Sequence, residues 1–368
     1  MTVDIYAPTA NDTLSAEEMT LYRLIMDYRA ENGLAAIPLS DALTITAGRH
    51  ATDTVANIWQ PRLDLPDGAN LHSWSDAPYF SDHRQPEIMW HAPERLGTGF
   101  EGFGFEISTE LGGVTTPSAA LASWKGSPGH DAVIRNTGVW ADFSWTAIGV
   151  GIDRLANGRT IMHVWFSDTP DANPARQLGT ASSNAMSGTD FADHLLALGG
   201  HDTLNGLRGD DLLFGGAGRD RINAGAGNDQ LDGGKANDIL SGGQGRDTLS
   251  GGAGSDRLDG GAGRDDLTGG AGADSFILRA AEGDRIGDFG ATDRLVLDGR
   301  PFLVLGKAIS AAEFHVGAAA ETADQHLIYD RDTGRLWFDR DGNGAAAAQL
   351  LAQLQGLPEL DRGDLVLS

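Results

Sequence analysis

The chain has 368 residues, with 52 acidic against 27 basic side chains, a net charge of −25, 51 glycines and no cysteine. The absence of cysteine excludes disulfide scaffolds, zinc ribbons and cysteine nucleophiles, so a bound metal would be held by oxygen or imidazole ligands. The acidic charge disfavours nucleic acid and anionic lipid surfaces as partners, because both would be repelled, whereas hard cations would be attracted.

The first 168 residues indicate a domain of mixed helices and strands. Ser15 and Glu18 form a capping-box pattern before a helix, and a second helix is expected over residues 40–58. Strand-like runs follow at Ala147–Ile152 and Thr160–Phe166. We therefore expect an α+β or three-layer domain over residues 1–168.

Neither a cleavable signal peptide nor a transmembrane segment is expected. Residues 1–12 contain no basic residue and no apolar core, and no apolar run approaches the about 18 residues that span a bilayer. By that test alone the protein would be cytosolic.

Five stretches of this domain occur in a characteristic order. They read LIMDYRAENGLAAIPLSDALTITAGRHATD from Leu24, NLHSWS around His72, GFGFEIS around Glu106, ASWKGSPGHDAVIRN around His130, and AIGVGI from Ala147. Together they resemble the CAP superfamily, which contains cysteine-rich secretory proteins, insect antigen 5 and plant pathogenesis-related proteins. The resemblance covers roughly residues 14–168 and implies an α-β-α sandwich with a cleft that holds two histidines and two acidic residues.

By this resemblance, His72 and His130 match the two histidines and Glu106 matches the first acid. The second acid would fall near Ser127, so the set is incomplete. Two imidazoles and a carboxylate can hold Zn²⁺ with an activated water, which leaves open a metal-dependent hydrolase that uses His72, Glu106 and His130. The alternative is that the histidines only hydrogen-bond across the cleft. No HExxH or GxSxG motif occurs, so we favour a binding role over an enzymatic one.

Three other histidines lie nearby in the sequence. We expect His83, His91 and His163 to be structural or surface residues, with His163 on a strand. Residues 169–187 (TPDANPARQLGTASSNAMS) are rich in Pro, Ser, Ala and Asn without periodicity, and this composition predicts a linker.

A period of nine residues runs without insertion from Gly188 to Ile277. Glycine dominates positions one, two and four, and position eight is Leu, Ile or Phe in all ten blocks. Position six is always aspartate: Asp193, Asp202, Asp211, Asp220, Asp229, Asp238, Asp247, Asp256, Asp265 and Asp274. This pattern resembles the RTX, or hemolysin-type, calcium-binding repeat, which forms a parallel β-roll.

The physical chemistry of the repeat supports the same fold. Glycines allow a turn in which carbonyl groups point at an ion, and the apolar residue of the short strand that follows faces inward. Two nonapeptides would make one coil, so alternate aspartates would stack on opposite edges with Ca²⁺ between successive coils. Five loops on each edge leave four gaps, or up to about eight ions. Ala236 occupies position four of one block, where we expect local strain.

The charge of the repeats makes their folding depend on calcium. Residues 188–277 contain fifteen Asp, no Glu, six Arg and one Lys. Without calcium the aspartates should repel one another and the repeat segment should remain unfolded. One apolar residue per nonapeptide cannot offset the conformational entropy lost when the segment becomes ordered.

Residues 278–368 are expected to form a β-rich flanking region. Two short β runs, Arg285–Phe289 and Arg294–Leu297, could close the end of the solenoid, and a hairpin is predicted over Thr333-Gly334. Asp339 begins an EF-hand-like pattern, but Leu350 stands where a bidentate Glu is required, so we favour a turn, with one further calcium left open.

The last residues, 364–368 (DLVLS), resemble the acidic and apolar terminus of substrates of type I ABC transporters, although an ordinary strand fits equally well. The sequence therefore predicts a secreted, extracellular calcium-binding protein that a type I ABC apparatus exports. Its N-terminal domain would be an effector or a module for an unidentified lipid, glycan or protein ligand. The alternatives are the hydrolase above and a surface or matrix adhesion protein.

Overall fold

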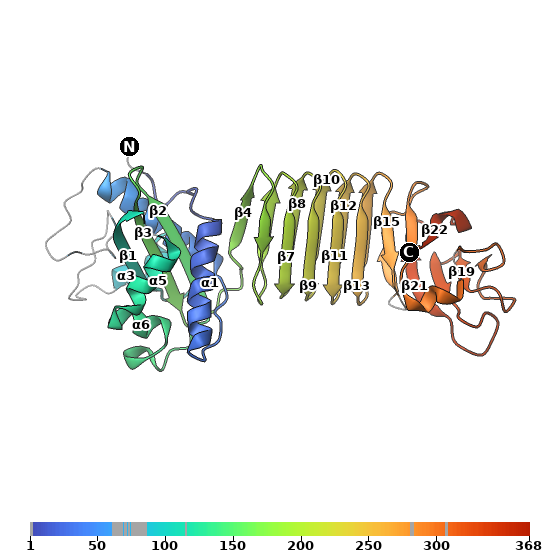
Figure 1. Cartoon of the computed structure of the whole chain (residues 1–368), viewed down its shortest axis with the longest axis horizontal. Coiled ribbons are helices and arrows are strands. Elements are labelled where there is room, and N and C mark those ends of the chain that lie inside the picture. Colours follow the sequence, from blue (N-terminus) through green and yellow to red (C-terminus); the bar gives the residue numbers. More distant parts are fainter. Residues whose placement is uncertain are drawn as a thin grey trace. The chain divides into compact units, whose positions relative to one another are not determined.

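The computed structural model describes residues 3–60, 69, 72, 74, 87–114, 116–279, 283–305 and 308–368. The chain divides into two compact units, residues 1–178 and 179–368 (Figure 1). Each unit has its own hydrophobic core, and no residue is shared between the cores among the described residues.

The first unit consists of helices around a small antiparallel sheet whose strand order is β1-β3-β2. The strands are β1 (Phe105–Val114), β2 (Ala147–Arg154) and β3 (Arg159–Ser167). The helices are α1 (Ala16–Glu31), α2 (Asp41–Asp53), the π-helix η1 (Thr54–Trp59), α3 (Glu87–Trp90), α4 (Ala92–Arg95), α5 (Pro117–Lys125), α6 (Pro128–Ile134) and the 3-10 helix η2 (Gly138–Trp140).

The capping box predicted at Ser15 is present, because the Ser15 hydroxyl accepts from the Glu18 backbone and the Glu18 carboxylate accepts from the Ser15 backbone. The second predicted helix is divided between α2 and η1. Strand β1 was not expected from the sequence, and it carries Glu106.

Helices cover both faces of the sheet. On one face, apolar residues of β2 such as Ile148 and Val150 share a core with α1 and α5. On the other face lies α2, which approaches β2 closely because β2 has glycine there: a Cβ on Gly151 would lie 2.2 Å from the carbonyl carbon of Ala47. The unit is therefore an α+β domain of three layers.

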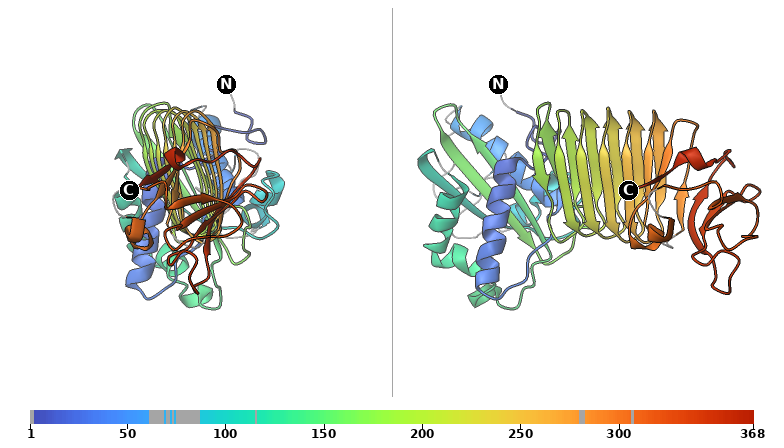
Figure 2. Two further views of the ribbon diagram at one scale, coloured as in Figure 1. Left: turned by 90° about the vertical axis from the view of Figure 1, so that its right-hand side faces the viewer. Right: turned by 45° about the vertical axis from the view of Figure 1, so that its right-hand side comes forward.

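The second unit is a parallel solenoid with a C-terminal extension (Figures 1 and 2). Its strands are β4 (Arg176–Thr180), which begins in the first unit, β5 (Ala185–Ser187), β6 (His194–Leu198), β7 (Thr203–Arg208), β8 (Leu212–Ala217), β9 (Arg221–Ala226), β10 (Gln230–Lys235), β11 (Ile239–Gln244), β12 (Thr248–Ala253), β13 (Arg257–Ala262), β14 (Asp266–Ala271), β15 (Ser275–Leu278), β16 (Asp284–Ile286), β17 (Arg294–Leu297), β18 (Phe314–Val316), β19 (Leu327–Asp330), β20 (Arg335–Phe338), β21 (Gln349–Leu354) and β22 (Leu365–Leu367), with 3-10 helices η3 (Arg300–Leu305) and η4 (Arg362–Asp364).

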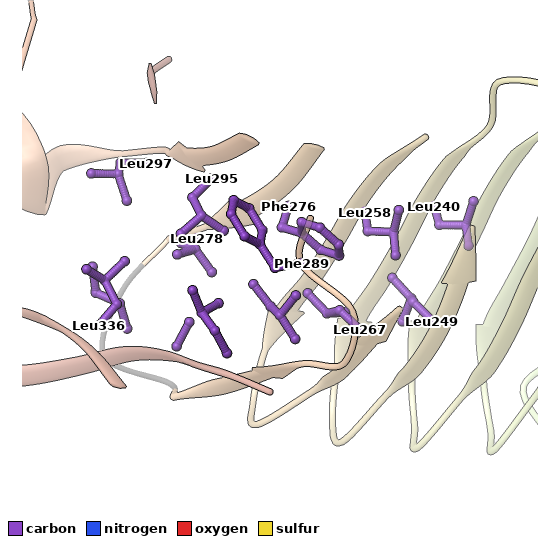
Figure 3. Close-up of a cluster of buried hydrophobic side chains, with 14 of the residues drawn as sticks. Leu240, Leu249, Leu258, Leu267, Phe276, Leu278, Phe289, Leu295, Leu297 and Leu336 are labelled. Atoms are coloured by element: carbon purple, nitrogen blue, oxygen red, sulfur yellow. The ribbon is translucent and has the colours of Figure 1, made fainter. Parts of the chain in front are cut away.

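Each repeat strand pairs in parallel with the strand two nonapeptides away. Leu231 of β10 is opposite Leu213 of β8 and Leu249 of β12, while Leu240 of β11 is opposite Ile222 and Leu258 in the other sheet. The prediction that two nonapeptides make one coil is confirmed. The position-eight side chains of both sheets are buried in one continuous aliphatic core, part of which Figure 3 shows.

Glycine is favoured at position four because successive coils stack closely there. Gly218 has a φ of 133°, and a Cβ there would lie 1.4 Å from the carbonyl oxygen of Gly200 in the preceding coil. Ala236 occupies the same position with a φ of 75°, in the left-handed region that costs a non-glycine residue free energy. The strain expected at Ala236 is therefore present in its backbone.

The segment 169–187, expected as a linker, contains the two strands β4 and β5. Strand β5 pairs with β7, and β4 is an edge strand of the sheet that contains β6. Parallel pairing to a preformed sheet uses backbone groups, so it requires no nonapeptide period in the added strand.

Beyond the repeats, β16 and β17 extend both sheets by one strand, and β21 and β22 extend them further. The two short β runs therefore lengthen the solenoid rather than close it. The predicted hairpin is present as β19 and β20, with Gly334 in its turn. The EF-hand-like segment is a turn in which the Asp339 carboxylate accepts from the Asp341 backbone at 3.3 Å. No helix among the described residues is long and apolar enough to cross a membrane.

Candidate functional site

The ten repeat aspartates form two columns, one in each edge of the solenoid. Within a column, the Oδ1 atom of each aspartate after the first accepts a hydrogen bond from the backbone N–H of the aspartate 18 residues earlier, at 2.7–2.9 Å. One column contains Asp193, Asp211, Asp229, Asp247 and Asp265, and the other contains Asp202, Asp220, Asp238, Asp256 and Asp274. The alternation of nonapeptides therefore places these side chains as expected.

The second carboxylate oxygen of these residues faces an oxygen-lined space. In nine of the ten, all except Asp193, the buried Oδ2 atom has no hydrogen-bond partner among the described residues. A Cβ on Gly206 would lie 2.1 Å from Oδ2 of Asp211 and 2.5 Å from the carbonyl oxygen of Ala224, so glycine leaves room where these oxygens converge. Buried oxygens without donors fit Ca²⁺, which takes carboxylate and carbonyl oxygen ligands.

The carboxyl groups of the columns are held in an unfavourable environment for charge. Burial, followed by the negative charges of Asp193 and Asp229, raises the pKa of Asp211 to about 8. Burial and the neighbouring aspartates likewise raise the pKa of Asp238 and of Asp247 to about 7. A divalent cation would reverse this penalty by neutralising the stacked carboxylates.

Folding of the solenoid without calcium should therefore depend on pH. The raised pKa values mean that the folded, ion-free columns bind protons more tightly than the unfolded chain does, and this stabilisation is lost as the pH rises through 7 to 8. In chelator, the β content is therefore expected to rise as the pH falls from about 8 to about 6, because protons then neutralise the stacked carboxyl groups in place of calcium. Circular dichroism in chelator over this pH range tests this, and a β content that does not rise would contradict it.

The columns differ at their two ends. At the start, Oδ2 of Asp193 already accepts from the Thr189 backbone at 2.6 Å and from its hydroxyl at 3.0 Å. At the far end, the columns continue to Asp284 and Asp293, which accept from the backbones of Asp265 and Asp274. These two aspartates are not among the ten predicted from the sequence, because each lies 19 rather than 18 residues along the chain.

The N-terminal unit contains a second cluster of titratable groups, centred on Glu106 of β1. Oε2 of Glu106 lies 2.8 Å from Nδ1 of His72, whose side chain is 18% exposed. His130 of α6 is half-buried, and burial and then the charge of His72 lower its pKa. Ser127 precedes α6, where its backbone donates to the Trp124 carbonyl. His72 and Glu106 are thus brought together, and His130 lies near enough for their charges to act on its pKa.

Two further histidines contact Glu106 from the buried side. His50 Nδ1 lies 2.8 Å from Oε1 of Glu106, and His163 Nδ1 contacts the same oxygen. His163 was expected to be a structural or surface residue, and it is completely buried; its contact with Glu106 was not predicted. The available signals were a histidine on the apolar face of α2 and another inside the apolar run Thr160–Phe166. His91 is exposed and paired with Glu94, and His83 lies outside the described residues.

The charges of this cluster favour an ionised Glu106. Burial alone would raise the pKa of Glu106, but His50, His163 and His72 together hold that pKa well below its usual range. Burial and then the charge of His50 lower the pKa of His163 to about 4. At neutral pH, His163 is therefore an uncharged imidazole beside a carboxylate, and both are suitable metal ligands.

Comparisons with solved structures give a number of similar chains. Three of them are an outer surface protein from Borrelia burgdorferi (17% identity over 42% of this chain and 96% of that chain, TM-score 0.29), a subunit of the mannuronan C5-epimerase from Azotobacter vinelandii (23% identity, 53% and 86%, TM-score 0.18), and an extracellular lipase from Serratia marcescens (15% identity, 54% and 41%, TM-score 0.19). At these TM-scores the likenesses support no functional argument. No curated protein matches the chain.

The family comparison concerns the repeats. Residues 178–213, 187–222, 206–240, 214–249 and 241–276 match the family described as RTX calcium-binding nonapeptide repeat (4 copies). None of the comparisons supports the CAP resemblance of residues 14–168. Residues 178–276 of this chain therefore carry RTX calcium-binding repeats in the form of a parallel β-solenoid.

Proposed function

We propose that this chain is a secreted calcium-binding protein whose solenoid folds when it meets extracellular calcium. The observation that carries the proposal is the pair of aspartate columns, in which nine buried Oδ2 atoms lack a donor among the described residues. Such oxygens are costly to bury without a cation, so occupancy of the columns and folding of the coils would be coupled. Residues 1–178 would then be the extracellular effector or ligand-binding module.

The proposed export route is a type I ABC apparatus that recognises the C-terminal region. The supporting argument is that calcium-poor cytosol would leave the repeats unfolded, which suits passage through a narrow channel, and that folding outside would prevent return. Removing residues 279–368, or only the last few residues, should trap the protein inside cells that carry the transporter. Removing residues 1–175 should not.

Truncation alone is ambiguous, because β22 pairs with β17 and its loss also removes a strand of the solenoid. A transfer experiment avoids this problem. Residues 279–368 fused to a carrier protein that is normally retained should carry it into the medium, whereas the same fusion without residues 364–368 should stay inside. Normal secretion of the truncated chain would contradict type I export.

A second candidate function is metal-dependent hydrolysis in the cleft implied by the CAP resemblance. The observation that favours it is the 2.8 Å contact between Glu106 and the partly exposed His72, with His130 nearby. In this hypothesis His72, Glu106 and His130 would hold Zn²⁺, and a metal-bound water would be the nucleophile. Hydrolysis of a panel of ester, peptide and glycoside substrates that is lost in His72→Gln would support it.

A further inference from the structure

We infer that His50, Glu106 and His163 form a buried site for one divalent transition-metal ion. One donor atom from each residue lies within 4.8 Å of the other two, and all three side chains are completely shielded from solvent. This ligand set differs from the cleft expected from the sequence, which consists of His72, Glu106 and His130. Glu106 is common to both, but the buried histidines face its Oε1 atom and His72 faces Oε2.

The fold builds this site from three distant segments. In the antiparallel sheet, Ser108 of β1 is opposite His163, so Glu106 and His163 lie on the same face of neighbouring strands. On that face β2 presents Gly149 and Gly151, whose missing side chains allow the backbone of α2 to pack directly against the strand. Because α2 lies this close, His50 reaches the carboxylate of Glu106.

The two histidine rings present the same nitrogen, Nδ1, to the same carboxylate oxygen of Glu106. The rings of His50 and His163 are stacked, with centroids 3.9 Å apart and planes 19° apart, and both Nδ1 atoms face Oε1 of Glu106. Trp74 stacks on the other side of His50 at 4.1 Å and shields the group. Nε2 of His163 has no hydrogen-bond partner among the described residues. No hydrogen bond at Nε2 from these residues therefore fixes which of the two ring nitrogens carries the proton.

The donor set selects the class of ion. Two imidazole nitrogens and one carboxylate oxygen suit Zn²⁺ and related first-row ions, whereas Ca²⁺ prefers oxygen ligands alone. The site is therefore chemically distinct from the aspartate columns. It also competes with a simpler arrangement, in which both imidazoles donate Nδ1–H to Glu106 and no metal binds.

Zinc binding to the full chain tests this inference. The protein is kept in millimolar calcium so that the solenoid stays folded, equilibrated with one equivalent of Zn²⁺, and passed through a desalting column before elemental analysis. We expect one zinc per chain, and His50→Gln and His163→Gln should each weaken zinc binding about tenfold or more. His91→Gln, at an exposed position of the same unit, is the matched control and should retain zinc.

One further variant, His130→Gln, distinguishes the buried site from the cleft. His130→Gln should leave zinc binding unchanged, because His130 is not one of the three ligands. Loss of zinc in His130→Gln with retention in His163→Gln would place the ion in the cleft and overturn the inference. Failure of the wild-type chain to bind zinc would overturn it as well, and neither result would affect calcium-dependent folding.

A measurement on the wild-type chain tests the inference without relying on variants that could fail to fold. Nitrogen-15 NMR of the imidazoles distinguishes a metal-bound Nδ1 with a protonated Nε2 from an Nδ1–H that donates to Glu106. Zinc should convert His50 and His163 to the first form. If both rings keep a protonated Nδ1 in the presence of zinc, the cluster is only hydrogen-bonded and the inference is wrong.

Discussion

Removing calcium from the full chain is expected to abolish the parallel β structure of residues 179–368 while the first unit stays folded. Each nonapeptide buries one Leu, Ile or Phe, which contributes about 1.5–3 kcal/mol, whereas ordering nine residues at about 1–2 kcal/mol each costs several times more. The stacked carboxylates add repulsion, since successive coils of a parallel sheet are only about 4.8 Å apart. Folding without a cation is therefore unfavourable.

Two spectroscopic signals separate the units in one sample. Seven of the eight tryptophans lie in residues 1–178, so tryptophan emission reports mainly on the first unit. The far-ultraviolet circular dichroism of β structure reports mainly on the solenoid. In chelator the β signal should fall and tryptophan emission should change little, and added millimolar calcium should restore the signal cooperatively because each ion joins two coils. Full β content in chelator would refute calcium-dependent folding.

Substituting an interior aspartate should harm folding much more than substituting the first one. Asp247 accepts from the Asp229 backbone and donates its own N–H to Asp265, and its Oδ2 atom faces the oxygen-lined space between coils. Asp193 has no preceding aspartate in its column, and Thr189 already occupies its Oδ2 atom. An ion on either side of Asp247 would use it as a ligand, whereas Asp193 would serve one site at most.

The comparison is made with Asp247→Ala and Asp193→Ala in the full chain. The calcium midpoint should rise about tenfold or more for Asp247→Ala and only slightly for Asp193→Ala. Asp247→Asn is an isosteric variant that can still accept from the Asp229 backbone but loses the charge, so it should behave like Asp247→Ala. Equal shifts for Asp193 and Asp247 would contradict the column arrangement.

The cluster around Glu106 shows which contacts the sequence motifs predicted and which they did not. The sequence identified Glu106 and His72, which do contact each other, from short stretches that resemble a known pattern. It assigned no role at Glu106 to His50 and His163, because each looks like an ordinary polar residue within an apolar segment. Their meeting depends on the order β1-β3-β2 and on the close approach of α2 at Gly149 and Gly151.

By itself, the sequence determined the solenoid: its period, the inward apolar residue, the stacked aspartates and the two nonapeptides in each coil. This was possible because the strands of successive coils pair at a constant offset of 18 residues, so local spacing also sets the tertiary register. Only the tertiary structure decided where the period is broken. Asp284 and Asp293 continue the columns through their carboxylates, but they lie 19 residues along the chain and so fall outside the nine-residue period. Strands β4 and β5 join the sheets by backbone pairing, which leaves no mark in the side-chain pattern. The buried cluster at Glu106 likewise depends on packing between residues more than fifty positions apart, and sequence spacing cannot encode that packing.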